Sequence, residues 1–457
     1  MRQFKILGVA VAAALTVAAC GGGGGDGDQT PAVKFTSMVS FGDSLSDVGT
    51  YKVGTVAALG GGTYTVNGIA GAIGSNPTPS KNWTELIAAQ VDLAAPCPAQ
   101  TGLNSAASLG GPVAVTNNPA CTNYAQGGAR VTDPVGPGSA SAPVNSPLGQ
   151  LTVPIVTQIG RHLTKVGGSF SGTELVTVMA GGNDVLELLD LLKAQAAAAG
   201  TTAFGNSLAG GLTQQVPGFT AQTGVTIGTA LQTAAAAPGA TTTSIVTAAL
   251  MQAIALGAPA TLATPGDATL GAIIAAATTA GNAAGAAYAT TNGPAAVAAM
   301  AQAGGELAAY VKTLIIGKGA KYITVVNLPD VSLTPSAKAQ SLETQALISN
   351  MVIYFNTQLQ TGVAGLPGVI LVDAYADNRN QIANPAGYAL TNVKDTACNL
   401  TKPGPNALGS SLVCNTSNVI AGDTSHYLFA DTVHPTPYGY KLLAQLVTKS
   451  MVLAGWL

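Results

Sequence analysis

The stretch VSFGDSLSDVGT, Val39–Thr50, is the best starting point for predicting the fold. The overlapping run FTSMVSF, Phe35–Phe41, alternates in polarity and is rich in β-favouring residues, which predicts a short strand. Gly42 then predicts a turn, and we expect a helix to begin just after Ser44. A serine at such a turn has an exposed hydroxyl surrounded by unpaired backbone amides, which is the setting that a serine nucleophile needs.

The composition excludes one broad class of partner. Charged residues make up 8% of the 457 residues and the formal net charge is −2, so the chain has no basic surface for binding nucleic acid. The low content of charged residues is balanced by a high content of Ala, Gly, Thr, Ser and Asn. An uncharged polar composition of this kind favours a secreted or surface protein over a cytosolic one. The length allows one large domain or two smaller ones.

The N-terminal residues predict export. Arg2 and Lys5 precede the apolar run Ile6–Cys20, which is too short to span a bilayer permanently and is typical of a signal peptide. The residues VAAC, Val17–Cys20, resemble the lipobox of bacterial lipoproteins, which implies cleavage before Cys20 and attachment of lipid to its thiol. Ordinary signal cleavage with a leftover thiol is the alternative.

The predicted domain organisation follows from this leader. We expect a signal peptide over residues 1–19, a lipidated Gly-rich tether over 20–34 and one main domain over 35–457. Because Gly rather than Asp follows Cys20, the bacterial sorting pattern implies the outer membrane or cell surface of a Gram-negative bacterium. The expected anchor would hold the protein to a membrane through lipid.

The remaining cysteines predict disulfides rather than a metal site. They are an even number in an oxidising compartment: Cys97, Cys121, Cys398 and Cys414. The two sequence-local pairs, Cys97 with Cys121 and Cys398 with Cys414, close short loops in segments rich in Pro, Gly and Asn, and we favour them. No close Cys-x-x-Cys pair of the kind used in zinc sites is present, so we expect no metal.

Apolar runs alternate with helical patterns along the chain. Strands are predicted within Glu174–Asp184, Lys321–Pro329 and Gly368–Ala376, each separated from the next by helical periodicity. This order predicts an α/β fold with a central parallel sheet and helices on both of its faces. Ligands bind at the carboxyl ends of the strands in such sheets.

An insertion of Ala/Gly/Thr-rich helices is predicted at about residues 194–295. Asp267 is the one charged residue from Ala194 to Gly305, and no apolar stretch free of polar or Gly breaks clearly reaches membrane-spanning length. The insertion is either surface decoration or a lid that contacts lipid over a cleft.

Three histidines are candidates for a catalytic base. His162 lies mid-helix beside cationic residues, so we expect it on a solvated face. His426 and His434 each follow an aspartate by three positions, Asp423 and Asp431 respectively. An aspartate at this distance can fix the imidazole tautomer and stabilise the cation formed in catalysis. The spacing alone does not choose between the two pairs.

Two motifs resemble the first blocks of the GDSL (SGNH) lipase and esterase family. The residues FGDSLSDVG, Phe41–Gly49, are similar to the first block, which implies that Ser44 is the nucleophile. The residues NYAQGGAR, Asn123–Arg130, are similar to the second block, which implies that Gly128 donates an amide to the oxyanion together with the amide of Ser44.

Two further motifs complete the resemblance. The residues GGND, Gly181–Asp184, match the third block, which implies that the side-chain amide of Asn183 also donates to the oxyanion. The residues DTVHPT, Asp431–Thr436, match the fifth block and so select His434, oriented by Asp431, as the base. The long insertion departs from compact members of the family, which puts the substrate in doubt.

The resemblance implies a fold and an activity. The fold is the three-layer α/β/α SGNH-hydrolase architecture, which is flavodoxin-like, with the helical insertion added to it. The activity is a lipase, carboxylesterase or phospholipase that cleaves ester or lipid substrates through an acyl-enzyme, without a cofactor. The alternatives are an acyltransferase that moves an acyl group from phospholipid to an alcohol and, as a minor one, a non-enzymatic surface adhesin.

The other polar residues around Ser44 have predicted structural roles. We expect Gly42, Asp43, Ser46 and Asp184 to form and orient turns. Asp47 is expected to cap or charge the first turn of the helix after Ser44.

Overall fold

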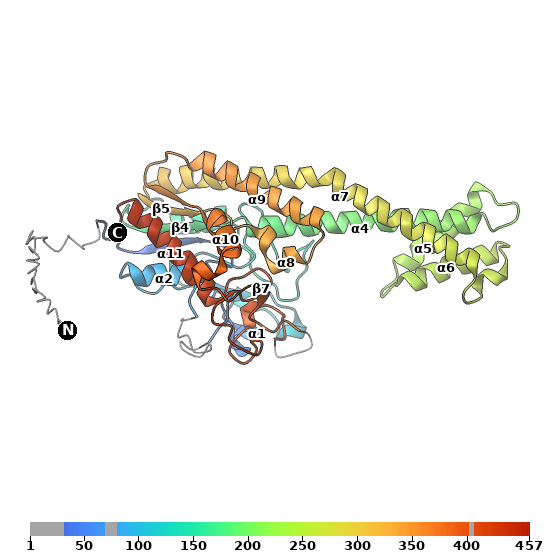
Figure 1. Ribbon diagram of the computed structural model, residues 1–457, viewed down its shortest axis with the longest axis horizontal. Coiled ribbons are helices and arrows are strands. Elements are labelled where there is room, and N and C mark those ends of the chain that lie inside the picture. Colours follow the sequence, from blue (N-terminus) through green and yellow to red (C-terminus); the bar gives the residue numbers. More distant parts are fainter. Residues whose placement is uncertain (1–31, 69–79, 402–405) are drawn as a thin grey trace, which may run out of the picture.

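The computed structural model describes residues 32–68, 80–401 and 406–457. The predicted signal peptide, Cys20 and the Gly-rich run of the tether lie outside the described residues. The described chain forms an α/β body from which a long helical arm extends to one side (Figure 1).

The body contains a sheet of four parallel strands, which confirms the predicted α/β fold. The strands lie in the order β1-β4-β5-β6. The carboxyl ends of all four strands therefore meet at one edge. On the outer side of β1, Ser40 forms a single parallel bridge with Asn123 in place of a further strand. The strands are β1 (Met38–Gly42), β4 (Leu175–Met179), β5 (Tyr322–Val326) and β6 (Val369–Val372).

Helices cover both faces of this sheet because its strands are apolar on both sides. In β4, Val176 and Val178 pack against α3, α7 and α9, whereas Leu175 and Met179 face α2 and α11. This continuous apolar pattern is typical of a buried parallel strand. The covering helices of the body are α2 (Trp83–Gln90), α3 (Ile155–Lys165), α9 (Leu342–Val363) and α11 (Pro437–Leu453).

The arm is built from the Ala/Gly/Thr-rich segment. Helices α4 and α7 run from the body side by side, and α5 and α6 lie at the far end (Figure 1). A Cβ atom added at Gly200 of α4 would lie 2.9 Å from the carbonyl oxygen of Gly281 in α7, so glycine permits close helix packing. The helices are α4 (Gly182–Thr213), α5 (Ala221–Ala235), α6 (Thr242–Ala255) and α7 (Ala268–Tyr310).

The length of α7 corrects one expectation. In the described residues, the helical run Ala268–Lys318 is long and apolar enough, by length and composition, to cross a membrane. The sequence suggested that Gly and polar residues would interrupt any such stretch. Instead, the helix continues through Pro294, supported by packing against α4 and α9. Helices packed within soluble proteins can pass the same length and composition test.

Smaller elements surround the carboxyl edge of the sheet. Both predicted disulfides are formed: Cys398–Cys414 lies near this edge, and Cys97–Cys121 lies beside the start of β1, where Thr122 contacts Met38. The additional strands are β2 (Gln100–Leu103), β3 (Val113–Asn117), β7 (Asn392–Thr396) and β8 (Tyr427–Phe429). The additional helices are α1 (Gly54–Ala58), α8 (Pro335–Lys338) and α10 (Ala374–Ala383).

Candidate active site

Ser44 and His434 meet at the carboxyl edge of the sheet. Ser44 lies just after β1, and His434 lies just before α11. The Nε2 atom of His434 is 2.9 Å from the Oγ atom of Ser44, although 390 positions separate them in sequence. The Nδ1 atom of His434 is 2.8 Å from Oδ2 of Asp431. The three side chains form a continuous hydrogen-bonded line from carboxylate to hydroxyl.

The carboxylate of Asp431 is buried and well supplied with donors. Its Oδ1 atom accepts hydrogen bonds from the backbone amides of Val433 and His434, and Oδ2 accepts one from the amide of Ser411 at 2.8 Å. Burial opposes ionisation, but the imidazole of His434 and these hydrogen bonds outweigh it and hold the pKa of Asp431 well below its usual range. Asp431 is therefore a carboxylate that can stabilise an imidazolium.

The other two histidines lie away from this line. The ring of His426 packs edge-on against Tyr438, with ring centres 4.3 Å apart. His162 is buried among Phe41, Tyr124 and Phe170, so the expectation of a solvated face was wrong. Burial lowers the pKa of His162 to about 4, which keeps this ring neutral.

Ser44, the predicted nucleophile, lies in a turn rather than at the start of a helix. The first helix after Ser44, α1, begins only at Gly54, so the expected helix is absent. Asp47 does not cap a helix as predicted. Its carboxylate instead accepts hydrogen bonds from the backbone amides of Gly49, Thr50 and Gly127. This buried carboxylate therefore organises the turn and connects it to a second loop.

Side chains from neighbouring elements hold the start of this turn. The side-chain amide of Gln158 in α3 accepts from the amide of Gly42 at 2.9 Å and donates to its carbonyl at 2.8 Å. Asp43 accepts a hydrogen bond from the amide of Leu45, and the indole of Trp83 donates to Ser46. These contacts match the turn-forming roles that we expected of Asp43 and Ser46.

Two backbone amides are available beside Ser44. Within the described residues, neither the N–H of Ser44 nor that of Gly128 donates to another backbone or side-chain group. Gly128 has φ +80°, and a Cβ atom there would lie 2.2 Å from the carbonyl oxygen of Pro137, so only glycine fits. Both residues line the same cavity, where unpaired amides can stabilise an oxyanion.

Asn183 lines this cavity from a third direction. It occupies the second position of α4, so the positive end of a 32-residue helix faces the site. Its Nδ2 atom donates to the carbonyl oxygen of Ala129 at 2.9 Å, which orients the amide group and leaves its second hydrogen available.

The next residue of α4 supports this arrangement. The carboxylate of Asp184 accepts from the guanidinium of Arg130 and from the amide of Val131, both at 3.1 Å. Burial nevertheless raises the pKa of Asp184 to about 6. These contacts join the start of α4 to the loop that carries Gly128.

The cavity in front of Ser44 has a volume of about 220 Å³ and is mainly apolar. No residue of the expected insertion, 194–295, lines it, so the arm does not cover the cavity. The ring of Tyr64 packs on the ring of His434, with centres 4.8 Å apart. The apolar lining side chains are Leu45, Pro137, Leu186, Leu328, Pro329, Val331 and Val433. In the described residues, no cluster of three or more His, Cys, Asp or Glu side chains could hold a metal ion.

Sequence reasoning missed several residues that support the site. Gln158 and Tyr64 are separated from Ser44 along the chain, and neither belongs to a motif. Ser411 contributes only a backbone N–H, which any residue except proline provides. No sequence signal could have identified these three, because their roles depend on the tertiary fold.

The fold and the site together define a class of protein. A parallel α/β sheet with a serine in contact with a histidine–aspartate pair at its carboxyl edge is the arrangement of a serine hydrolase. The chain belongs to the GDSL-like lipase/acylhydrolase family, whose model matches residues 194–447. Ser44, Gly128 and Asn183 precede the matched range.

Esterases and other relatives are similar to this chain over limited stretches. Esterase EstA of Pseudomonas aeruginosa is 34% identical over 142 residues, which cover 30% of this chain and 20% of the relative. The anther-specific proline-rich protein APG of Arabidopsis thaliana is 28% identical over 145 residues, 30% of this chain and 26% of the relative. A GDSL esterase/lipase of the same plant, At2g40250, is 24% identical over 149 residues, which cover 29% of this chain and 40% of the relative. The matches thus span well under half of each relative's length.

Proposed function

We propose that the protein is a serine ester hydrolase that cleaves acyl esters through an acyl-enzyme on Ser44. In the first step, His434 accepts the proton of the Ser44 hydroxyl while the oxygen attacks the ester carbonyl. The resulting oxyanion is stabilised by the amides of Ser44 and Gly128 and by the side chain of Asn183. His434 then gives its proton to the departing alcohol.

The second step releases the acid. His434 takes a proton from water while the water oxygen attacks the acyl-enzyme, and it then returns this proton to the Ser44 oxygen as the bond to the acyl group breaks. Asp431 keeps the imidazole in the required tautomer and stabilises its cation in both steps. The observation that carries the proposal is the 2.9 Å contact between His434 and Ser44, in a cavity that also contains the unpaired amides.

Labelling tests the nucleophile directly. A fluorophosphonate probe should attach to Ser44, located by peptide mass, and p-nitrophenyl esters should be hydrolysed. Ser44→Ala should lose both properties, and His434→Ala should lose nearly all turnover. Absence of labelling in the folded wild-type protein, together with absence of hydrolysis, would support a binding protein such as an adhesin instead.

The substrate is proposed to be an uncharged ester with an apolar acyl group. Support comes from the apolar side chains of the 220 Å³ cavity, which is small compared with the roughly 300–1,000 Å³ of many ligand pockets. We therefore expect short to medium acyl chains to be preferred over palmitoyl. Hydrolysis rates from acetyl to palmitoyl esters test this, and product analysis with an added alcohol distinguishes hydrolysis from acyl transfer.

We also propose that the protein is exported and anchored through lipid on Cys20 at the outer membrane or cell surface of a Gram-negative bacterium. The lipobox-like sequence supports this, and two disulfides suit an oxidising compartment. Labelled palmitate should be incorporated into the wild-type protein and not into Cys20→Ala. Fractionation of the outer membrane would test the location independently.

A further inference from the structure

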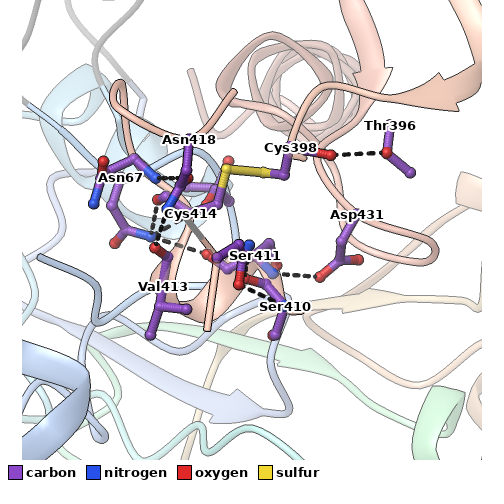
Figure 2. The surroundings of a disulfide bond; sticks show 12 residues. Asn67, Thr396, Cys398, Ser410, Ser411, Val413, Cys414, Asn418 and Asp431 are labelled. Atoms are coloured by element: carbon purple, nitrogen blue, oxygen red, sulfur yellow. Dashed lines mark hydrogen bonds between the residues drawn. A yellow bond between two sulfur atoms is a disulfide. The ribbon is translucent and has the colours of Figure 1, made fainter. Parts of the chain in front are cut away.

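Asp431 receives one hydrogen bond from a segment outside its own turn. Its Oδ1 atom is fixed by the amides of Val433 and His434, two and three residues later. Its Oδ2 atom, which lies 2.8 Å from Nδ1 of His434, also accepts the N–H of Ser411 at 2.8 Å. Figure 2 shows this hydrogen bond between Ser411 and Asp431, together with the nearby Cys398–Cys414 disulfide. Nδ1 of His434 is also 2.9 Å from Oδ1, so both oxygens face the imidazole, and the Ser411 N–H is the backbone donor that holds the second oxygen, Oδ2, in this position.

Ser411 is the first residue of a short 3₁₀ turn, Ser411–Val413. The side chain of Asn67 donates to the carbonyl oxygens of Ser411 and Cys414, both at 3.0 Å. The hydroxyl of Ser410 accepts from the amide of Leu412 and closes the start of the turn. These bonds fix the turn on the side away from Asp431 (Figure 2).

The disulfide connects this turn to the strand segment that leads into Asp431. Cys414 directly follows the turn, and Cys398 donates its backbone N–H to the carbonyl oxygen of Ala430 at 2.9 Å. Ala430 is the residue before Asp431. The bond Cys398–Cys414 thus links the donor of the Ser411 hydrogen bond to the chain that carries its acceptor.

We propose that the backbone N–H of Ser411, held in place by the Cys398–Cys414 disulfide, is a positioning donor that sets the orientation of the Asp431 carboxylate toward His434. The inference rests on the proposed function, because it assigns a role within the same site. A carboxylate fixed at both oxygens cannot rotate away from the imidazole. Loss of the Oδ2 donor should impair proton transfer at Ser44 more than substrate binding, although the neighbouring Ser410 lines the cavity.

Proline at position 411 removes this hydrogen-bond donor and also places its Cδ atom against Oδ2 of Asp431, which pushes the carboxylate away. Proline is well tolerated at the first position of a helical turn, and Ser410 already has the extended conformation (φ −140°, ψ 149°) that a following proline requires. Ser411→Pro should lower kcat for p-nitrophenyl butyrate about tenfold or more, with KM within about twofold of wild type. The conservative variant Ser411→Ala keeps the N–H and should restore most of the turnover.

A matched control separates the donor from the effect of proline itself. Ala107 is the exposed first residue of another 3₁₀ turn, Ala107–Leu109, and it follows the extended residue Ala106. Its N–H donates to no other group in the described part of the chain. Ala107→Pro should therefore leave kcat and KM unchanged. A general destabilising effect of proline would instead appear in both variants.

The disulfide supplies a second test that does not depend on the folding of Ser411→Pro. The double variant C398A/C414A should lower kcat about fivefold or more with little change in KM, because the turn can then move away from Asp431. The double variant C97A/C121A, which removes the other disulfide, should retain kcat within about twofold. Melting curves establish that each protein is folded at the assay temperature.

The outcomes distinguish the two proposals. Wild-type turnover in both Ser411→Pro and C398A/C414A, with Ser44 still labelled, would overturn the positioning role and leave the ester hydrolase intact. If Ser411→Pro does not fold, wild-type kcat in C398A/C414A alone overturns it. A wild-type protein that is folded but neither hydrolyses esters nor reacts with the probe would contradict both proposals.

Discussion

The Oδ2 atom of Asp47 accepts a hydrogen bond from the backbone N–H of Gly127 at 3.0 Å. Its Oδ1 atom binds the amides of Gly49 and Thr50 at 2.8 Å. The nucleophile turn and the loop carrying Gly128 are therefore joined by one buried carboxylate. Because the two unpaired backbone amides beside the nucleophile belong to these two segments, Asp47 sets the distance between them.

Replacing Asp47 by Asn should disturb this connection. An amide side chain has the shape of the carboxylate but presents an NH₂ group to one of the three backbone donors, which leaves a buried N–H unpaired. We expect a loss of about 1–3 kcal/mol in the free energy of unfolding and a fall in kcat. Denaturant titration and ester kinetics measure both. The same change at exposed Asp190 should alter neither quantity, and wild-type stability in Asp47→Asn would contradict this structural role.

The sheet could be predicted because its strands are rich in β-favouring residues and are separated by helical patterns. β4, β5 and β6 fall within the predicted segments, and β1 extends one residue past its predicted end, to Gly42. The order of these strands with intervening helices predicts a parallel sheet. The meeting of Ser44 with His434 could be predicted only from the resemblance to known motifs. Local sequence contains no information about a contact across 390 positions.

The errors came from tertiary contacts that override local patterns. The cationic neighbours Arg161 and Lys165 led us to expect His162 on a solvated face, but His162 and Gln158 share the buried face of α3. His162 packs against aromatic rings, and Gln158 forms hydrogen bonds with the backbone of Gly42, so both side chains are buried. Asp47 likewise accepts hydrogen bonds from three backbone amides, two in its own turn and one in a neighbouring loop. The chain after Ser44 therefore forms this turn and not the expected helix.

Removal of the Asn183 side-chain amide should affect turnover more than binding. The amide is positioned by its bond to Ala129 and faces the cavity beside Ser44. Loss of one oxyanion donor typically costs on the order of a hundredfold to a thousandfold in kcat. Asn183→Ala should show this loss with a short p-nitrophenyl ester while KM changes little. Unchanged kcat would remove Asn183 from the mechanism.

The buried carboxyl of Asp43 predicts a pH dependence of stability. Burial raises the pKa of Asp43 from 3.8 to about 7, so the folded protein holds a proton that the unfolded chain has released. This contribution to stability is complete below about pH 4 and is lost as the pH rises toward 7. Asp43→Asn cannot titrate, so its free energy of unfolding should fall less steeply between pH 4 and 7. Equal slopes in the two proteins would contradict the prediction.

Two glycines of α7 test whether the arm acts on the site. A Cβ atom at Gly281 would lie 2.9 Å from the carbonyl oxygen of Gly200, whereas one at Gly271 would meet no atom within 4 Å. Gly281→Ala should separate α4 from α7 and speed amide hydrogen exchange in the arm. Gly271→Ala should slow that exchange, because alanine stabilises a helix by about 0.5–1 kcal/mol relative to glycine.

Both glycine variants should hydrolyse a soluble short ester at the wild-type rate, because no residue of 194–295 lines the cavity. The pair separates an effect of arm packing from an effect of adding a methyl group. A fall in kcat in Gly281→Ala alone would mean that movement of α4 reaches Asn183, at the start of the same helix. Equal exchange rates in the two variants would contradict the role of close glycine packing in the arm.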